Sequence, residues 1–225
     1  MSDQSTRFPG ISVIAKAALD TPEPPADDEA AAERIRGCVG GARHACAGCG
    51  YTDARTSDRV LGMMTGHPVD GDHARIKVKQ NLVAVCPICH DIAHIGYAPT
   101  HGRGEVLLGG FIPQQEITAM ARLCMVAKHN DGQFQTTAES YYKRLREALW
   151  GSTRKLLGDQ YDGRPETFGK LLQSDAFAQR VTEPDKALLD VRYLPALDGY
   201  ATATAYWART QFGTWPESEW LNYAV

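Results

Sequence analysis

The segment from His44 to His94 reads HACAGCGYTDARTSDRVLGMMTGHPVDGDHARIKVKQNLVAVCPICHDIAH and contains two Cys-x-x-Cys pairs. The pairs are Cys46/Cys49 and Cys86/Cys89. Two residues between paired cysteines allow a tight turn that directs both sulfur atoms to one ion, and four thiolates satisfy tetrahedral zinc. The glycines at 48 and 50 provide backbone freedom for the first turn. The spacing therefore predicts one structural Zn²⁺ bound by four cysteines.

An alternative interpretation is that the two pairs are unrelated, or that one is a thioredoxin-like redox pair. A redox motif requires only one Cys-x-x-Cys pair, so it leaves the second pair unexplained. The four-cysteine zinc site is the better interpretation.

The residues between and after the pairs predict two short strands and a helix. Asp58–Met64 is expected to be a strand, HPVDGD (67–72) a turn, and NLVAVC (81–86) a second strand. Pro87–Ile95 is expected to be a helix, because Pro at the first helical position loses no hydrogen bond. The predicted fold class is α+β, with a ββα-metal zinc module followed by a mainly helical C-terminal part.

This module resembles the zinc-ribbon branch of the HNH endonucleases, in the two cysteine pairs, the histidine between them and the Asn81-Leu82 before CPICH. The resemblance implies two adjacent catalytic side chains, a metal ligand followed by a general-base histidine. Here the sequence is Gly66-His67-Pro68. If His67 is the base, Gly66 offers no metal ligand, and if His67 is the ligand, Pro68 cannot accept a proton. The nuclease site is therefore expected to be degraded.

Other histidines leave an alternative open. His90 and His94 lie one helical turn apart on the same predicted face. Together with His67, Asp70 or His73 they are candidate ligands of a second metal. Otherwise they orient or pack around the zinc site.

Composition and the chain termini restrict the function classes. The chain has 225 residues and a formal net charge of −3, which disfavours a protein whose main task is binding a phosphate backbone. No window approaches the roughly 18 apolar residues of a membrane span, and MSDQSTRFPG lacks the order of a signal peptide. A reducing cytoplasm is expected, where thiols bind metal. Cys38 and Cys124 are expected to be small buried residues.

The remaining sequence predicts further elements around the zinc module. Ile11–Leu19 is expected to be a strand or short helix, Thr21–Asp28 an exposed Pro-rich spacer, and Ala26–Val39 a helix. Downstream we expect a loop over Gly96–Gly104, a strand over Glu105–Ile112 interrupted by two glycines, and helices over 113–130, 136–157 and 166–174.

Two of these helices carry apolar stripes at helical spacing. The stripe of the first comprises Ile117, Met120, Ala121, Cys124 and Ala127. The stripe of the second comprises Tyr142, Leu145, Leu149 and Leu156. These stripes are interpreted as core or as partner surface.

The last part of the chain is rich in Trp and Tyr, including Trp207, Trp215 and Trp220. Such residues either stabilise a small subdomain, which is the favoured interpretation, or form a protein-binding surface. The predicted organisation is an N-terminal part (1–43), the zinc module (44–96), a partner-binding platform (97–180) and an aromatic acidic segment (181–225).

The downstream half resembles the IcmJ/DotN family of type IVB secretion and related conjugation systems. The resemblance covers about residues 44–175 and is carried by the zinc module followed by GEVLLGGFIPQQEITAMARL, TTAESYYKRLREA and FGKLLQSD. It implies a cytoplasmic adaptor of the coupling complex, at the inner face of the bacterial inner membrane. In that family an HNH-like zinc fold without nuclease action binds the C-terminal extension of the type IV coupling ATPase. The spacer at 21–28 and the residues after 181 have no counterpart in the resemblance.

Two hypotheses of different classes follow. The first is a non-catalytic zinc adaptor that binds the coupling ATPase tail and other coupling-complex proteins, with no membrane insertion. The second is a metal-dependent endonuclease or nickase in which His67, Asn81, His90 and His94 form a relocated site. A weaker third hypothesis is a zinc module that binds nucleic acid without cutting it.

Overall fold

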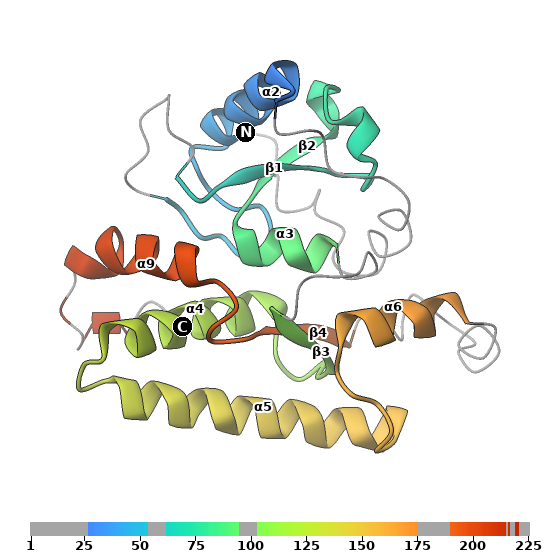
Figure 1. The fold of residues 1–225 in the computed structure, drawn as a ribbon, viewed down its shortest axis with the longest axis vertical. Coiled ribbons are helices and arrows are strands. Elements are labelled where there is room, and N and C mark those ends of the chain that lie inside the picture. The colour runs from blue at the N-terminus through green and yellow to red at the C-terminus, as the bar shows by residue number, and fades with distance from the viewer. Residues whose placement is uncertain are drawn as a thin grey trace. The chain divides into compact units, whose positions relative to one another are not determined.

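The chain folds into two units, Met1–Ala98 and Pro99–Val225, each containing helices and one small antiparallel sheet. The computed structural model describes residues 27–53, 62–94, 103–174, 190–214, 216 and 219–220. Within these residues the protein is a mixed α+β structure, as the sequence predicts (Figure 1).

The first unit is built on the hairpin of β1 (Thr65–Pro68) and β2 (Leu82–Val85). The strands pair antiparallel, with His67 opposite Val83. Helix α2 (Glu29–Gly41) packs on β1 and β2, and α3 (Pro87–Ala93) also contacts both strands. Figure 1 shows the two helices on opposite sides of the strands. All four residues of β2 are apolar, and all four are buried.

Sequence features explain where these elements start. Helix α2 begins at Glu29, after Asp28, whose side chain accepts a hydrogen bond from the Ala31 amide at 3.1 Å. Such a side chain satisfies an amide that has no partner within the helix. Helix α3 begins at Pro87, as predicted, and ends at Ala93. Two short 3₁₀ turns, η2 (His73–Arg75) and η3 (Lys79–Asn81), connect β1 to β2.

The predicted turn over 67–72 is wrong at its start, because His67 and Pro68 belong to β1. The chain turns directly after Pro68, where the Gly71 amide donates to the Pro68 carbonyl at 3.0 Å. Gly71 has a φ of 74°, a conformation that glycine adopts without a steric penalty. The strand expected over 58–64 is wrong for its described residues, because 62 and 63 form a turn and β1 begins only at Thr65. Residues 58–61, the element expected over 11–19 and residues 21–26 of the spacer lie outside the described residues.

The second unit contains the sheet of β3 (Gly104–Leu108) and β4 (Val191–Pro195) and the helices α4 (Gln114–Asn130) and α5 (Gln135–Leu157). The strands pair antiparallel over their full length. Figure 1 shows α4 and α5 side by side. Residues 191–195 thus share a sheet with residues 104–108, although more than eighty residues of sequence separate the two segments.

The core of this unit lies between the sheet and the two long helices. It comprises Leu107, Ile117, Leu145, Leu149 and Leu194. The predicted stripe of α4 is confirmed as buried except at Met120, which is half-buried. In α5, Leu145 and Leu149 are buried and belong to the core, whereas Leu156 is 72 % exposed and does not.

Two further helices complete the described part of the unit, α6 (Pro165–Gln173) and α9 (Ala201–Arg209). Helix α9 packs on α4. A short 3₁₀ turn, η4 (Phe212–Thr214), follows it.

The aromatic residues after 190 are largely internal. Trp207 and Trp220 are buried, and Trp220 makes edge contacts with Phe134 and Phe212. The guanidinium of the buried Arg122 lies 5.1 Å from the Trp207 ring centroid. For these residues the stabilising role is confirmed, whereas Trp215 lies outside the described residues.

Among the described helices, none combines the length and apolar character required to cross a membrane.

Candidate metal centres

The first cysteine pair lies in a tight loop after α2. The Gly50 amide donates to the Cys46 carbonyl at 2.9 Å, and the Cys46 amide donates to the Tyr51 carbonyl at 2.7 Å. Gly50 has a φ of 74°, so it provides the conformational freedom that the turn requires. The Ala47 amide donates to the Ala84 carbonyl at 2.8 Å, which fixes this loop against β2.

The second pair lies at the junction of β2 and α3. Cys86 directly precedes α3, and Cys89 lies in its first turn. The Cys86 amide also donates to the Cys46 sulfur at 3.3 Å, which links the two pairs directly. The strand and the helix thus position one pair, and the loop attached to β2 positions the other.

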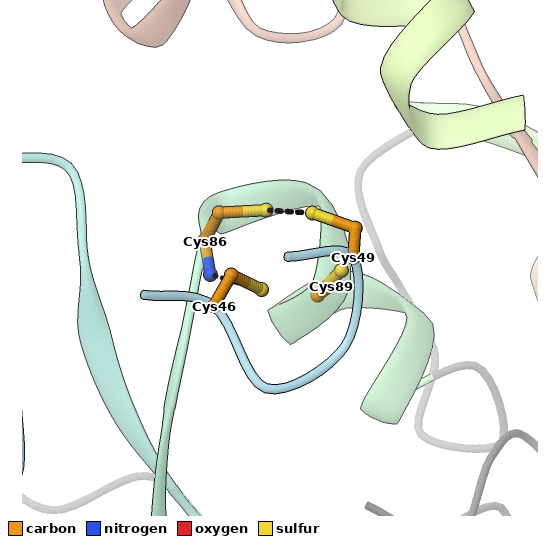
Figure 2. Close-up of side chains that lie close together, drawn as sticks. All are labelled: Cys46, Cys49, Cys86 and Cys89. Carbon is orange, nitrogen blue, oxygen red and sulfur yellow. Dashed lines mark hydrogen bonds between the residues drawn. The ribbon is translucent and has the colours of Figure 1, made fainter. Parts of the chain in front are cut away.

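The four sulfur atoms face one another (Figure 2). All lie within 4.8 Å of one another, and no disulfide joins them. The Cys49 and Cys86 sulfurs are 3.7 Å apart. Sulfur ligands about 2.3 Å from a tetrahedral ion are separated by about 3.8 Å, so the set fits one such metal ion.

The burial of these thiols explains why a cation would stabilise their ionised form. Cys46, Cys86 and Cys89 are buried, and Cys49 is half-buried. Burial raises the pKa of the Cys46 thiol well above its usual value. Hydrogen bonding with Cys46 and the other two cysteines, followed by burial, raises the pKa of Cys89. A bound divalent cation would offset this cost, because metal binding deprotonates the thiols.

Four histidines form a second cluster in the same unit. His67 comes from β1, His73 from η2, and His90 and His94 from α3 and its C-terminal end. The Nε2 atom of His94 lies 3.2 Å from Nε2 of His73 and 3.3 Å from Nε2 of His90. One ring nitrogen each of His67, His73 and His94 can be chosen such that all three lie within 4.8 Å of one another.

His67 is the most deeply buried member of this cluster, with 0 % of its surface exposed. Burial, followed by the charges of His90, His94 and His73, lowers the pKa of His67 to about 2. His67 is therefore a neutral imidazole at neutral pH.

The two neighbours of His67 do not join the cluster as ligands. A Cβ atom added to Gly66 would contact Ile35 of α2, with Cγ1 at 3.1 Å. Successive strand residues point to opposite faces, so position 66 faces α2 while His67 faces the other histidines. Pro68 offers no titratable group.

Asn81 and Asp70, two other predicted site residues, make hydrogen bonds and an ion pair within the segment that connects β1 to β2. The Asn81 side-chain amide donates to Asp70 Oδ1 at 2.8 Å, and the Asn81 carbonyl accepts from the Val69 amide at 2.7 Å. Asp70 also pairs with Arg75. Together these contacts hold the chain between β1 and β2, and neither residue joins the candidate ligand groups found among the described residues.

The remaining cysteines lie apart from both clusters. Cys124 is buried in α4, and its sulfur donates to the Ala138 carbonyl at 3.2 Å. Burial raises the pKa of Cys124 to about 12 and that of the half-buried Cys38 to about 11. Both thiols are therefore protonated at neutral pH. The predicted burial is confirmed for Cys124, whereas Cys38 is only half-buried, against Ala31, Ile76 and Leu82.

Comparison with known proteins does not place the chain in a family. No protein-family model matches it, and no curated protein sequence is significantly similar to it.

Proposed function

We propose that Cys46, Cys49, Cys86 and Cys89 bind one structural Zn²⁺ and that the first unit is a degenerate HNH-like ββα-metal module. Two observations support this proposal. The donor set is four sulfur atoms in a group that fits a tetrahedral ion. The order of β1, β2 and α3, with one cysteine pair at the β2–α3 junction, is the order expected of such a module.

We further propose that the protein is a non-catalytic adaptor of a type IVB secretion or conjugation coupling complex. It would act in the cytoplasm, at the inner face of the bacterial inner membrane, through its partner, the C-terminal extension of a type IV coupling ATPase. The observation that carries the non-catalytic part is the sequence Gly66-His67-Pro68 in β1, which lacks either the metal ligand or the general base. The partner itself rests on the resemblance of residues 44–175 to the IcmJ/DotN family.

The proposed binding surface differs from the apolar stripe of α5. Leu145 and Leu149 are buried in the core of the second unit and are not accessible to a partner. Leu156 and Phe111 are instead 72 % and 62 % exposed. The Leu108 amide donates to Thr153 Oγ1 at 2.8 Å, which brings the chain segments carrying these two residues together. A few side chains supply most of the binding energy of an interface, so these two exposed apolar residues are the positions to test.

The experiment measures binding of the purified full-length protein to a peptide comprising the coupling ATPase tail from its own system. We expect Leu156→Glu and Phe111→Glu each to weaken binding at least tenfold while zinc content and the far-UV circular dichroism spectrum stay unchanged. Val78→Glu is the matched control, because Val78 is 40 % exposed in the first unit. Absence of binding by the wild-type protein, or equal affinity of all variants, would contradict the proposal.

A metal-dependent nuclease is the second candidate, favoured by the histidine cluster around His67. Because Gly66 and Pro68 leave the catalytic pair incomplete, we expect no nicking of supercoiled plasmid with Mg²⁺, Mn²⁺ or Ni²⁺ above a His67→Ala control. Cleavage by the wild-type protein that disappears in this control would favour the nuclease.

A further inference from the structure

The histidine cluster gathers four imidazoles from three separate elements into a mostly buried site. His67, His73 and His94 are at most 6 % exposed, and His90 is half-buried. All six pairs of rings lie within 6.4 Å between centroids. Histidines that only fill a core are not expected to meet in fours, because apolar side chains fill such space without polar atoms.

His67 is a buried polar side chain whose ring nitrogens are unsatisfied. Among the residues that the structure describes, neither ring nitrogen of His67 finds a hydrogen-bond partner, although the side chain is fully buried. An unsatisfied buried polar group costs about 1–3 kcal/mol, and native structures contain few of them. The ring lies 4.9 Å from that of His94 and 5.5 Å from that of His73, so its nitrogens belong to the same small space.

The separations of the other nitrogens have the spacing of metal ligands. Nitrogen ligands about 2.0–2.1 Å from a tetrahedral zinc ion are about 3.3–3.4 Å apart. The observed Nε2 separations are 3.2 Å for His73 and His94 and 3.3 Å for His90 and His94. The cysteine cluster of the same unit reproduces its own expected spacing equally well, with a sulfur separation of 3.7 Å.

We propose that His67, His73 and His94 bind a second metal ion distinct from that of the four cysteines, with His90 next to His94 beside this group. Imidazole nitrogen suits borderline divalent ions such as zinc, nickel or copper, and zinc is the ion to test first. The ion would provide the missing partner of His67 and join β1, η2 and α3.

The residues beside His67 provide no general base for a water on this second ion. A zinc ion with three protein ligands keeps one position for water or substrate, and activating that water requires a base. The neighbours of His67 are Gly66 and Pro68, and neither has a side chain that accepts a proton. The site thus adds a metal to the first unit without restoring hydrolysis.

The two sites differ in charge, which predicts an order of affinity. Four cysteine thiolates neutralise the ion and leave an excess of negative charge, whereas three neutral imidazoles leave its positive charge buried. A buried uncompensated charge is costly, so the histidine site should bind zinc more weakly. A chelator titration of the zinc-loaded protein should therefore release one ion well before the other.

The experiment is a metal count on the full-length protein, dialysed against Zn²⁺ and then freed of excess metal. We expect two zinc ions per chain in wild-type protein and in the control His129→Ala, whose histidine lies in the second unit. His73→Ala and His94→Gln should each retain one. X-ray absorption at the zinc edge of the wild-type protein needs no variant and should show both sulfur and nitrogen ligands.

Several outcomes would overturn the inference. These are one zinc per chain with only sulfur ligands in the wild-type protein, or two zinc ions in folded His73→Ala and His94→Gln.

Discussion

Alternation along β1 decides which residues of the first unit can take part in chemistry. Gly66 faces Ile35 of α2, and His67 faces the other histidines. A side chain at position 66 would require Ile35 to shift, because its Cβ would lie 3.1 Å from Ile35 Cγ1. The absence of a metal ligand at this position is therefore part of the packing of α2 on the sheet.

At the same scale, replacing Cys86 by Ser should remove the tightly bound zinc and unfold the first unit. Structural zinc contributes on the order of 10 kcal/mol in small metal domains, which is comparable to the stability of a whole domain. Zinc content and thermal unfolding followed by circular dichroism measure the effect. Cys38→Ser is the control, because Cys38 lies outside the cluster and should keep both the metal and the midpoint. A Cys86→Ser protein with unchanged metal and midpoint would disprove the four-cysteine site.

At the scale of elements, α5 carries leucines with opposite environments seven residues apart. Leu149 is fully buried against Leu107, Ile117 and Leu194. Leu156 is 72 % exposed. Both leucines belong to one helix, so their difference in burial arises because the sheet and α4 cover only part of the length of α5.

This contrast provides a matched pair of variants. Leu149→Ala should destabilise the second unit by roughly 2–5 kcal/mol, because it leaves a cavity in the core. Leu156→Ala should change the stability by less than about 0.5 kcal/mol, because it alters only exposed surface. Urea unfolding of both variants, followed by tryptophan fluorescence, measures the two values. Equal destabilisation by the two substitutions would show that the core assigned to this unit is wrong.

At the scale of the whole molecule, metal ligands and tryptophans lie in different units. Both candidate metal sites belong to residues 1–98, and all four tryptophans belong to residues 99–225. Among the described residues of the second unit no candidate metal group is found, and its core contains Trp207 and Trp220. We therefore expect metal to stabilise one unit, while aromatic and aliphatic packing stabilises the other.

Removal of metal should separate the two units experimentally. After treatment with a strong zinc chelator, we expect loss of helical circular dichroism from the first unit and protease sensitivity within residues 27–94. Tryptophan emission should keep its wavelength, because Trp207 and Trp220 stay buried. Readdition of zinc should reverse the changes. A red shift of the emission on chelation would show that the second unit depends on the metal as well.

The sequence by itself determined the local features of this protein. The two Cys-x-x-Cys pairs predicted the four-cysteine group, Pro87 marked the start of α3, and apolar spacing predicted α4 and α5 to within one residue. These features depend on residues close together in the chain, where spacing and backbone preference suffice. The sequence also named His73 as a candidate ligand, but it could not choose between His73 and Asp70.

Only the tertiary structure decided the long-range features. It placed His73 against His94, turned Asp70 towards Asn81, and paired β3 with β4 across more than eighty residues of chain. It also buried Leu149 and left Leu156 exposed. Each of these outcomes depends on which surfaces meet when distant segments pack, and periodicity along one helix or strand does not contain that information.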